Sequence, residues 1–424
     1  MKKIMILGGG PNQIGLLKAA KKCRYIVILC DKNPNCIGRS LSDSFYEVDT
    51  IDDEKLLKIA IKEKIDGVID YDIVPSIKVA PMNAQSKIDG VISNSEAIME
   101  NVAIIASELG LRGNSRESIS ILNSKEMFRD FQQEIGLYAP KHAIVENIDE
   151  LSNMLSDFEF PIIVKPVKCS GTRGTEKFES LDVEKIRETV NSCMNYSRNK
   201  KCSIEEYVEM SSLIVLEGDV FLNQGKIFFG GLFFTQRSKE LPMVPMTYMS
   251  PYIDSQKHMR IIEKTLIEIF DKLKIRHGQY NIEAYFNKDD LLFIIEINAR
   301  QGGHGLPAYV KLATGIDLDK ALVTTAVGDD EYFDNIMNEQ FEQKYATRHT
   351  IFGNKDGILN GLYISEDIRP YVVSIELEKK IGDSVEKRKN GSSYIGFVNL
   401  VFENYELQHK YSENIEDYIY PIIR

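Results

Sequence analysis

The first 70 residues alternate short apolar strands with helical segments, and this rhythm constrains the fold more than any other feature of the chain. The expected elements are strands at residues 3–7, 25–30 and 67–70 and helices at residues 13–23 and 53–63. Strands that alternate with helices form a parallel sheet with helices on both faces. We therefore expect a Rossmann-like α/β domain over residues 1–95.

Glycines follow the first predicted strand at positions 8–10, and Asp31 follows the second, as in a dinucleotide-binding domain. The spacing differs from the G-x-G-x-x-G fingerprint, because Gln13 occupies the place of the third glycine. A P-loop is excluded too, since Leu16 stands where that motif requires lysine. We interpret the glycines as a tight turn from strand to helix. An NAD-dependent oxidoreductase is the alternative from another functional class.

The composition indicates a globular protein that acts on small molecules. The chain has 424 residues, 43% of them hydrophobic, and its formal net charge of -11 provides no general attraction to nucleic acid or to an anionic membrane. No apolar run reaches the roughly 20 residues of a membrane-spanning helix. The six cysteines form no C-x-x-C pair, so neither a disulfide framework nor a zinc site is indicated. We expect a cytoplasmic protein with reduced thiols and keep a homodimer as an open option for its assembly.

The remainder of the chain is predicted to form two further units. Residues 95–136 have a helical pattern in which Ser115 or Ser118 is the expected cap. The other expected elements are strands at 143–145 and 162–165, three strands over 203–234, helices at 149–158, 256–273 and 318–326, paired strands at 278–286 and 291–297, a polar linker at 328–345, and hairpin-like strands at 372–377 and 394–402. We expect one mixed domain over residues 96–330 and a small mixed α/β domain over residues 331–424.

The strand that ends at Arg300 carries the most informative polar residues of the chain. Strand alternation places Glu296, Asn298 and Arg300 on one face, and the turn before this strand brings Glu283 opposite Glu296. These groups are costly to bury without partners. Two carboxylates and an amide oxygen suit magnesium, with manganese as the alternative ion. A structural salt bridge from Arg300 to either glutamate is the other interpretation.

Two further segments have the chemistry of a nucleotide site. Lys165 ends an apolar strand, where a lysine is unusual unless it meets an anion such as phosphate, and the small residues at 170–175 follow it with many backbone donors. Cys169 precedes this loop, and we interpret it as a plain thiol because no histidine follows within the motif. Residues 204–209 end another strand in a connector whose backbone suits an adenine edge, although an ordinary strand end has the same pattern.

The order of these motifs, together with a helical segment that begins Ser124-Lys125-Glu126, resembles the ATP-grasp superfamily over nearly the whole chain. The resemblance implies a Rossmann-like first domain, an ATP-grasp domain with a mobile lid at about residues 140–208, and the small C-terminal domain. It implies ATP contacts from the following residues: Lys125, Lys165, Ser170, Gly171, Thr172, Glu206, Tyr207, Val208, Glu209 and Ile295. It also implies a magnesium site at Glu283, Glu296 and Asn298.

Within this superfamily, the segment Arg300-Gln301-Gly302-Gly303-His304 resembles the amino-acid and dipeptide ligases. The resemblance implies substrate contacts from Arg300, Gly302, Gly303 and His304. Biotin-dependent carboxylases have a glutamate four residues after the corresponding arginine, where this chain has His304. Carbamoyl phosphate synthetases have two ATP-grasp halves, and this chain has one. The runner-up is a ligase or carboxylase of the kind found in purine biosynthesis.

The implied reaction joins a small-molecule carboxylate to an amine through an acyl phosphate and releases ADP and phosphate. Lys165 and Arg300 would be the catalytic residues, because they offset the charge of the transferred phosphoryl group. A non-catalytic nucleotide-binding regulator would lack a metal ligand or a lysine, and none is missing.

Two further features leave their role open. Arg237 is either a phosphate or substrate contact or a solvated strand end, and the apolar residues 241–249 are interpreted as a loop that either packs in the core or lines a substrate pocket.

Overall fold

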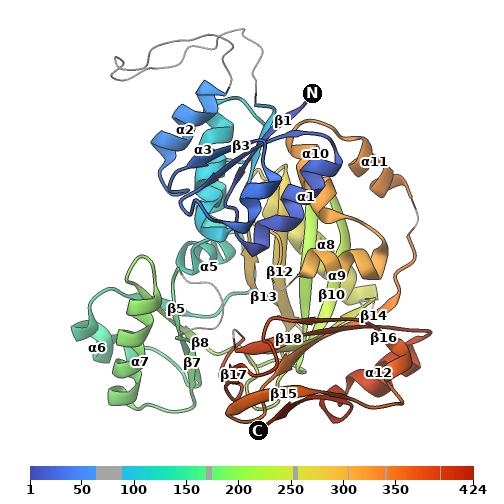
Figure 1. Cartoon of the computed structure of the whole chain (residues 1–424). Coiled ribbons are helices and arrows are strands. Elements are labelled where there is room, and N and C mark those ends of the chain that lie inside the picture. The colour runs from blue at the N-terminus through green and yellow to red at the C-terminus, as the bar shows by residue number, and fades with distance from the viewer. Residues whose placement is uncertain (64–87, 169–173, 252–255, 304, 340, 392) are drawn as a thin grey trace.

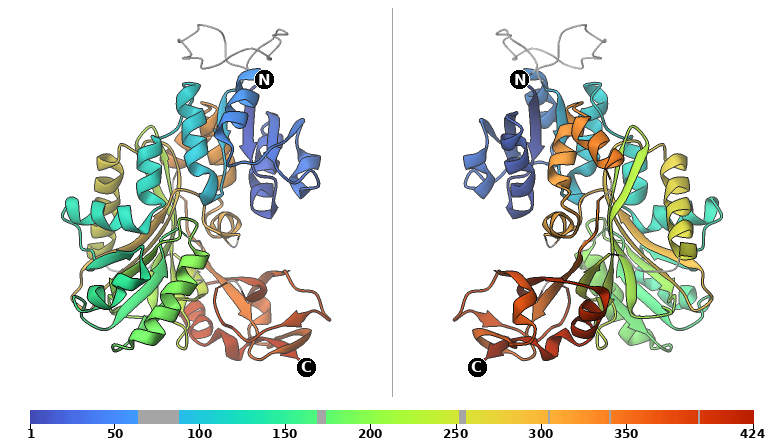
Figure 2. Two further views of the ribbon diagram at one scale, coloured as in Figure 1. Left: turned by 90° about the vertical axis from the view of Figure 1, so that its left-hand side faces the viewer. Right: turned by 90° about the vertical axis from the view of Figure 1, so that its right-hand side faces the viewer.

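The computed structural model describes residues 1–63, 88–168, 174–251, 256–303, 305–339, 341–391 and 393–424. It confirms a mixed α/β fold of several parts, built around four sheets (Figure 1). The N-terminal part and the C-terminal strands lie at opposite ends of one large sheet (Figure 2). No helix in these residues is long and apolar enough to cross a membrane.

The N-terminal part contains the predicted parallel sheet. Its order is β3-β2-β1-β4, and its elements are β1 (Lys3–Leu7), β2 (Ile26–Asp31), β3 (Ser44–Glu47) and β4 (Gly90–Ile92), with α1 (Ile14–Lys22), α2 (Asp53–Lys62) and α3 (Met99–Glu108). The predicted strand at 67–70 lies outside the described residues. The predicted strands at 3–7 and 25–30 and the predicted helices at 13–23 and 53–63 therefore agree with the structure to within about a residue or two at each end.

The glycine turn after β1 packs closely on its surroundings. A side chain at Gly9 would place its Cβ 2.6 Å from the sulfur of Cys36. The Asp31 carboxylate accepts hydrogen bonds from the Gly9 amide at 2.6 Å and from the Asn33 amide at 2.7 Å. Asp31, the residue that would contact a ribose in a dinucleotide site, is thus occupied in holding two turns of its own domain.

An eight-stranded antiparallel sheet forms the centre of the molecule. Its strands, in sheet order, are β13 (Leu292–Asn298), β12 (Gly278–Phe286), β9 (Ile214–Asn223), β10 (Lys226–Arg237), β11 (Pro245–Ser250), β14 (Tyr345–Phe352), β18 (Tyr394–Phe402) and β16 (Val372–Leu377). The predicted pairings of 278–286 with 291–297 and of 372–377 with 394–402 are confirmed. The large sheet contains strands from both sides of residue 330, because β11 pairs with β14. The domain division at residue 330 stays a prediction.

Helices cover the large sheet on both faces. One core joins strand residues such as Leu216 and Ile282 to α4 (Arg116–Leu122), α5 (Lys125–Glu134) and α8 (Gln256–Lys272). Another joins Phe221 and Tyr248 to α9 (Leu306–Thr314), α10 (Leu318–Ala326) and α1. Ser115 caps α4 by accepting a hydrogen bond from the Ser118 amide, so the first of the two predicted caps is correct.

A four-stranded sheet stands apart from the large one and corresponds to the predicted lid (Figure 1). Its order is β5-β8-β6-β7, with β5 (His142–Val145), β8 (Cys202–Glu206), β6 (Ile162–Pro166) and β7 (Glu176–Phe178), and with α6 (Leu151–Leu155) and α7 (Val183–Tyr196). The helix predicted at 149–158 is shorter than expected. The long helix α7 was not predicted, although it buries Ile186, Thr189, Val190 and Cys193 at helical spacing.

Two other predictions are wrong. Residues 241–249 were expected as a loop, but residues 245–249 belong to β11, which lies within the large sheet between β10 and β14. Residues 246–248 are buried there, so of the two roles considered for this segment, core packing is correct. The expected linker at 328–345 contains α11 (Glu331–Asn338), which buries Phe333 and Ile336 three residues apart on one helical face. In both cases packing against distant segments outweighed a weak local pattern.

The remaining C-terminal strands form a small sheet of their own. It contains β15 (Gly357–Ile364), β17 (Ser384–Val385) and β19 (Ile419–Ile423), and α12 (Tyr405–Ser412) completes this part. A core that includes Ile351, Val398 and Ile419 holds the small sheet against the last strands of the large one.

Candidate active site

A row of carboxylates crosses three strands of the large sheet. Glu283 on β12 lies opposite Glu296 on β13, as predicted, and opposite Glu217 on β9. Side chains at directly opposed positions lie on the same face about 5 Å apart. Glu217 was not predicted, although an acidic residue in the apolar run Ile214–Asn223 was a usable signal.

Glu296 is held by groups from two elements. The ammonium of Lys125 on α5 lies 3.4 Å from its carboxylate, and the Asn298 side chain donates a hydrogen bond to it at 2.8 Å. Burial alone would raise the pKa of Glu296, but Lys125 and Asn298 outweigh it and lower the pKa to about 2. Glu296 is therefore an ionised oxygen donor at any physiological pH.

Arg237 connects the other two glutamates and is only 6% exposed, so it is not a solvated strand end. Its guanidinium lies 2.9 Å from Glu283 and 3.5 Å from Glu217. Thr235 donates a hydrogen bond to Glu217 at 2.9 Å. Burial and the charge of Glu283 nevertheless raise the pKa of Glu217 to about 8. Glu217 is therefore mostly protonated at neutral pH, because the one guanidinium of Arg237 serves two carboxyl groups.

The donor set fits a hard divalent cation. Glu283, Glu296 and Asn298 supply only oxygen donors, and the two carboxylates are neighbours across the β12–β13 pair. Each is paired with a cationic side chain, Arg237 or Lys125, that a metal ion would replace. In the described part of the chain, no three His, Cys, Asp or Glu side chains are grouped as a ready metal site. The magnesium assignment stays a prediction.

Lys165 belongs to a buried charge cluster under the lid sheet. Its ammonium lies 2.7 Å from the carboxylate of Glu205, and the guanidinium of Arg129 lies 3.2 Å from the same carboxylate. Burial, aided by repulsion from Arg129 and Lys125, lowers the pKa of Lys165 to about 8 despite the attraction of Glu205. Arg129 and Glu205 were not predicted. The cluster has two cations for one carboxylate, which leaves it suited to an anion.

The predicted adenine connector lies against an apolar cluster. Val208 packs with Val215, Tyr285 and Phe293, and the predicted contact Ile295 packs against them. The carbonyl of Val208 accepts a hydrogen bond from the Tyr285 hydroxyl at 2.6 Å.

The polar groups of this connector have partners within the chain. The amides of Glu206 and Tyr207 donate to backbone carbonyls of Lys141 and Pro161, and Glu209 lies at the surface 3.4 Å from Lys288. The nucleotide contacts of these residues stay predictions.

Gly302, two residues after Arg300, is held by the buried Asp219 on β9. The Asp219 carboxylate accepts hydrogen bonds from the Gly302 amide at 2.9 and 3.1 Å, and from the side chains of Gln279 and Asn281 at 2.7 and 3.0 Å. A Cβ at Gly302 would lie 2.5 Å from the Leu306 side chain and 2.9 Å from the side-chain nitrogen of Asn281, so a larger residue would force these side chains to move. Asp219 was not predicted, and it fixes the backbone of the candidate substrate segment.

The Arg300 side chain is directed towards the segment between β4 and α3. It lies 3.9 Å from Glu96, which also pairs with Arg198 at 3.1 Å. The ion pairs of the described residues join Glu296 to Lys125 and Glu283 to Arg237, and neither glutamate to Arg300, so the alternative of a structural salt bridge there is wrong. Gly303 has open space around it. The predicted residues Ser170, Gly171, Thr172 and His304, and Cys169, lie outside the described residues.

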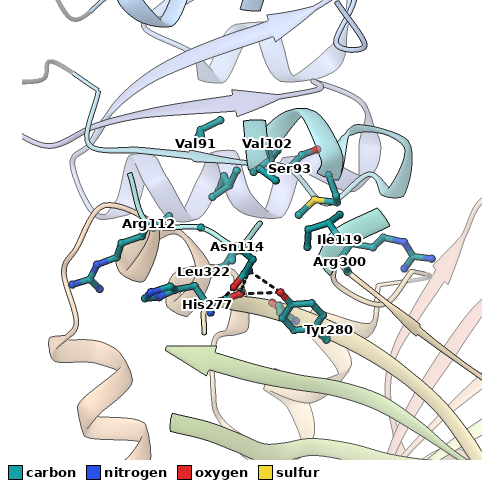
Figure 3. A pocket seen from close by; sticks show the side chains of 18 of the residues that line it. Val91, Ser93, Val102, Arg112, Asn114, Ile119, His277, Tyr280, Arg300 and Leu322 are labelled. Atoms are coloured by element: carbon teal, nitrogen blue, oxygen red, sulfur yellow. Dashed lines mark hydrogen bonds between the residues drawn. The ribbon is translucent and has the colours of Figure 1, made fainter. Parts of the chain in front are cut away.

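A separate, mainly apolar cavity of about 70 Å³ reaches the Arg300 segment from the first domain. Val91, Val102 and Leu322 line its middle, and Arg112 and Arg300 lie at opposite ends (Figure 3). Asn114 closes one side through hydrogen bonds to the His277 carbonyl and the Tyr280 hydroxyl. These bonds tie the α3–α4 connection to β12 behind the candidate site.

Residues 158–307 match the model of the ATP-grasp domain. The chain contains an ATP-grasp domain, as predicted. This segment includes Lys165, the connector at 204–209, both strands of the predicted metal site, and Arg300.

The sequence is similar to curated carbamoyl phosphate synthase large chains. It is 26% identical over 363 residues to that of Thermotoga neapolitana and 21% identical over 373 residues to that of Xylella fastidiosa. These matches cover 82% and 83% of this chain but only 30% and 32% of the relatives. The chain thus spans about a third of the length of the relatives it matches.

Solved structures share the fold over the whole chain. An L-amino acid ligase from Bacillus licheniformis superposes with a TM-score of 0.77 at 17% identity, covering 100% of this chain and 99% of the other. A phosphoribosylglycinamide synthetase from Anaerococcus prevotii gives 0.68 at 21% identity and 100% coverage of both. An N5-carboxyaminoimidazole ribonucleotide synthetase from Thermotoga maritima gives 0.68 at 16% identity, again covering both chains fully. At these identities the likeness establishes the fold.

Proposed function

We propose that this protein is an ATP-dependent carboxylate-amine ligase that forms an amide or peptide bond through an acyl phosphate. The observation that carries the proposal is the placement of Glu283 opposite Glu296, with Lys125 beside the second carboxylate. The cluster of Lys165 and Arg129 adds a site for the negative charge of the ATP phosphates. The similarity to an L-amino acid ligase supports this substrate class.

The charge pattern assigns roles along the site. Glu283, Glu296 and Asn298 would hold magnesium or manganese, which when bound supplies a Lewis acid at the phosphate oxygens. Lys125 and Lys165 would hold the phosphates of ATP, with Val208 and Ile295 against the base. Glu206, Tyr207 and Glu209 would complete the nucleotide contacts.

The proposed chemistry has two steps. A carboxylate oxygen attacks the terminal phosphorus of ATP, the bond to the bridging oxygen breaks, and ADP leaves. Arg300 and Lys165 stabilise the charge of the transferred group. The amine nitrogen then attacks the acyl carbon, phosphate leaves, and the nitrogen loses a proton. Gly302 and Gly303 bring backbone groups to the substrate because they have no side chains.

The lid would exclude water during this sequence. It contacts the segment that follows β4 through the pairs Arg198–Glu96 and Lys168–Glu100, at 3.1 and 3.5 Å. We propose that nucleotide stabilises this contact, and we expect MgATP to slow proteolysis within residues 140–208. Equal cleavage with and without MgATP would contradict the lid. We also propose that domain boundaries lie at about residues 95 and 330.

The test of the function is a screen for ADP and phosphate release. Carboxylates and amines, including all pairs of the common L-amino acids, are offered with MgATP. For the active pair, one ¹⁸O of a labelled carboxylate is expected in the released phosphate. AMP and pyrophosphate as products would refute the acyl phosphate. Activity with bicarbonate alone as the carboxylate would favour the purine-type carboxylase, and a spectral response to reduced nicotinamide would favour the oxidoreductase.

A further inference from the structure

Arg348 on β14 is a buried arginine for which the proposed chemistry has no use. It is 1% exposed. One guanidinium nitrogen donates to Asn399 at 2.9 Å and to Glu376 at 3.3 Å, and the other donates to Glu376 at 3.0 Å. The guanidinium also lies over the Phe397 ring at 4.1 Å, and its Nε has no hydrogen-bond partner. The arginine is therefore arranged to bind a carboxylate in bidentate fashion.

The register places Arg348 on the face of the sheet that carries the candidate site. Arg348 lies opposite Tyr248 on β11, and Tyr248 lies opposite Thr235 on β10. Thr235 donates its hydrogen bond to Glu217 in the carboxylate row. Arg348 lies three strands from β9 along this face, roughly 14 Å at about 4.8 Å per strand.

The candidate substrate segment approaches Arg348 directly. Gly305 follows that segment and is the N-cap of α9, with a φ of 70°. A Cβ at Gly305 would lie 2.8 Å from the guanidinium, so a side chain there would displace it. No side chain caps this helix end. The positive end of α9 and the Arg348 guanidinium thus converge at one point.

Glu376 supplies the carboxylate that Arg348 binds in this structure. It comes from β16, the edge strand of the large sheet, and its side chain is 48% exposed while that of Arg348 is 1% exposed. A half-exposed glutamate on an edge strand is a partner that can be displaced, because water solvates it when it leaves. Asn399 lies between the two and also donates to Glu376 at 2.7 Å.

We propose that Arg348, Asn399 and the N-terminus of α9 bind the free carboxylate of the amine substrate, in place of Glu376. The amine substrate is then an amino acid, whose amino group faces the acyl phosphate beside Arg300 while its carboxylate extends towards β14. This inference rests on the proposed ligase function and narrows its substrate class.

The test substitutes each member of the Arg348–Glu376 ion pair in turn, and the two substitutions are expected to have opposite effects on the KM. Arg348→Gln is expected to raise the KM for the amine-side amino acid by about tenfold or more, because a bidentate charged contact is lost. Glu376→Gln is expected to lower that KM several-fold, since it removes the competing carboxylate. A purely structural ion pair would make both substitutions harmful. The carboxamide of the same amino acid should be a poor substrate of the native protein and should be insensitive to Arg348→Gln.

Arg112→Gln is the matched control, because Arg112 forms a similar bidentate pair with Asp330 away from this face. It should leave the ratio of KM values for acid and carboxamide unchanged. Calorimetric binding of the common L-amino acids and their carboxamides provides a readout that needs no turnover. Binding that depends on Arg348 without ADP formation would refute the ligase and show that Arg348 binds an amino-acid carboxylate in another role. Equal use of acid and carboxamide, or equal effects of Arg348→Gln and Arg112→Gln, would overturn the inference.

Discussion

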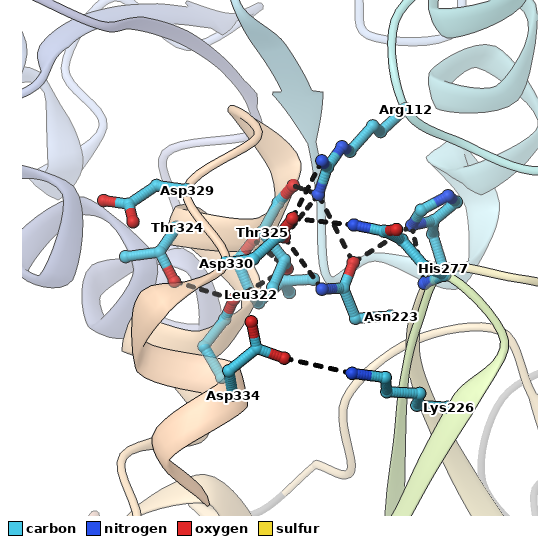
Figure 4. A network of polar contacts seen from close by, with 12 residues as sticks. Arg112, Asn223, Lys226, His277, Leu322, Thr324, Thr325, Asp329, Asp330 and Asp334 are labelled. Atoms are coloured by element: carbon cyan, nitrogen blue, oxygen red, sulfur yellow. Dashed lines mark hydrogen bonds and ion pairs between the residues drawn. The ribbon is translucent and has the colours of Figure 1, made fainter. Parts of the chain in front are cut away.

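Two polar networks of this protein differ in how their charges balance. In the first network, the Asp330 carboxylate pairs with Arg112 (Figure 4). It also accepts hydrogen bonds from the neutral side chains of Asn223 at 2.8 Å and Gln224 at 2.7 Å. Arg112 also donates a hydrogen bond to the Thr325 carbonyl. This network joins the α3–α4 connection, the β9–β10 turn and the segment between α10 and α11, and it is complete without a ligand.

The candidate site has the opposite property. Arg129 and Lys165 share the single carboxylate of Glu205, whereas Glu217 and Glu283 share the single cation Arg237. One end of the site thus has surplus positive charge, and at the other end Glu217 stays mostly protonated at neutral pH because Arg237 serves two carboxyl groups. A nucleotide phosphate and a divalent cation would complete them. The candidate site is also more deeply buried than the Arg112–Asp330 network, so it differs from this structural network both in burial and in charge balance.

The largest expected effect is at Glu296. Glu296→Gln keeps the shape of the side chain and removes the charge, so we expect turnover to fall by roughly a thousandfold or more, with the fold retained. Steady-state ADP release over a magnesium titration, with circular dichroism as the fold control, measures this. Native-like turnover with an unaltered magnesium dependence would remove Glu296 from the site.

Arg300 should have the next largest effect. We expect Arg300→Ala to slow the chemical step by about a hundredfold, because one preorganised charge donor to the transferred phosphoryl group is lost. Nucleotide affinity should change much less. Single-turnover kinetics and equilibrium ATP binding separate the two quantities, and an equal loss in both would assign Arg300 to ground-state binding instead.

A substitution in the Arg112–Asp330 network should change the stability of the protein and leave its reaction rate unchanged. Asp330→Asn removes the charge that Arg112 requires, and we expect the free energy of unfolding to fall by about 1–3 kcal/mol. The kcat at a temperature where the variant is folded should be unchanged. Chemical denaturation and ADP release measure the two effects. A large loss of kcat in a stable variant would place this network in the reaction.

The smallest expected effect is a pH-dependent gain of stability at Glu217. Burial raises its folded-state pKa from 4.5 to about 8, so its contribution to stability is complete below about pH 4.5 and is lost as the pH rises towards 8. Glu217→Gln should therefore stabilise the ligand-free protein by on the order of 1 kcal/mol at pH 8 and by little at pH 5. Denaturation at both pH values tests this, and a variant less stable at pH 8 would refute it.

Local patterns were sufficient for many elements. The strand Lys3–Leu7, the helix Leu318–Ala326 and the strand Gly278–Phe286 have the predicted bounds, because each is bounded by turn or capping residues next to a clear hydrophobic period. The hairpin placed Glu283 opposite Glu296 because its turn joins neighbouring strands. The order of motifs was also sufficient to predict the ATP-grasp domain.

What the sequence did not reveal depends on contacts between distant segments. Glu217 joins the carboxylate row only because β9 pairs with β12, about 60 residues further along the chain, and Asp219 reaches Gly302 by the same pairing. Arg129 and Glu205 meet across helix α5 and the lid sheet.

The sequence by itself determined which residues share a strand face, because side-chain alternation is a property of the local backbone. Only the tertiary structure decided which faces meet and which charges lack a partner. It inserted β11 into the large sheet and brought Arg348 beside Gly305. The physical reason is that strand pairing and charge balance depend on distances in space, and residues far apart in the chain carry no local signal of them.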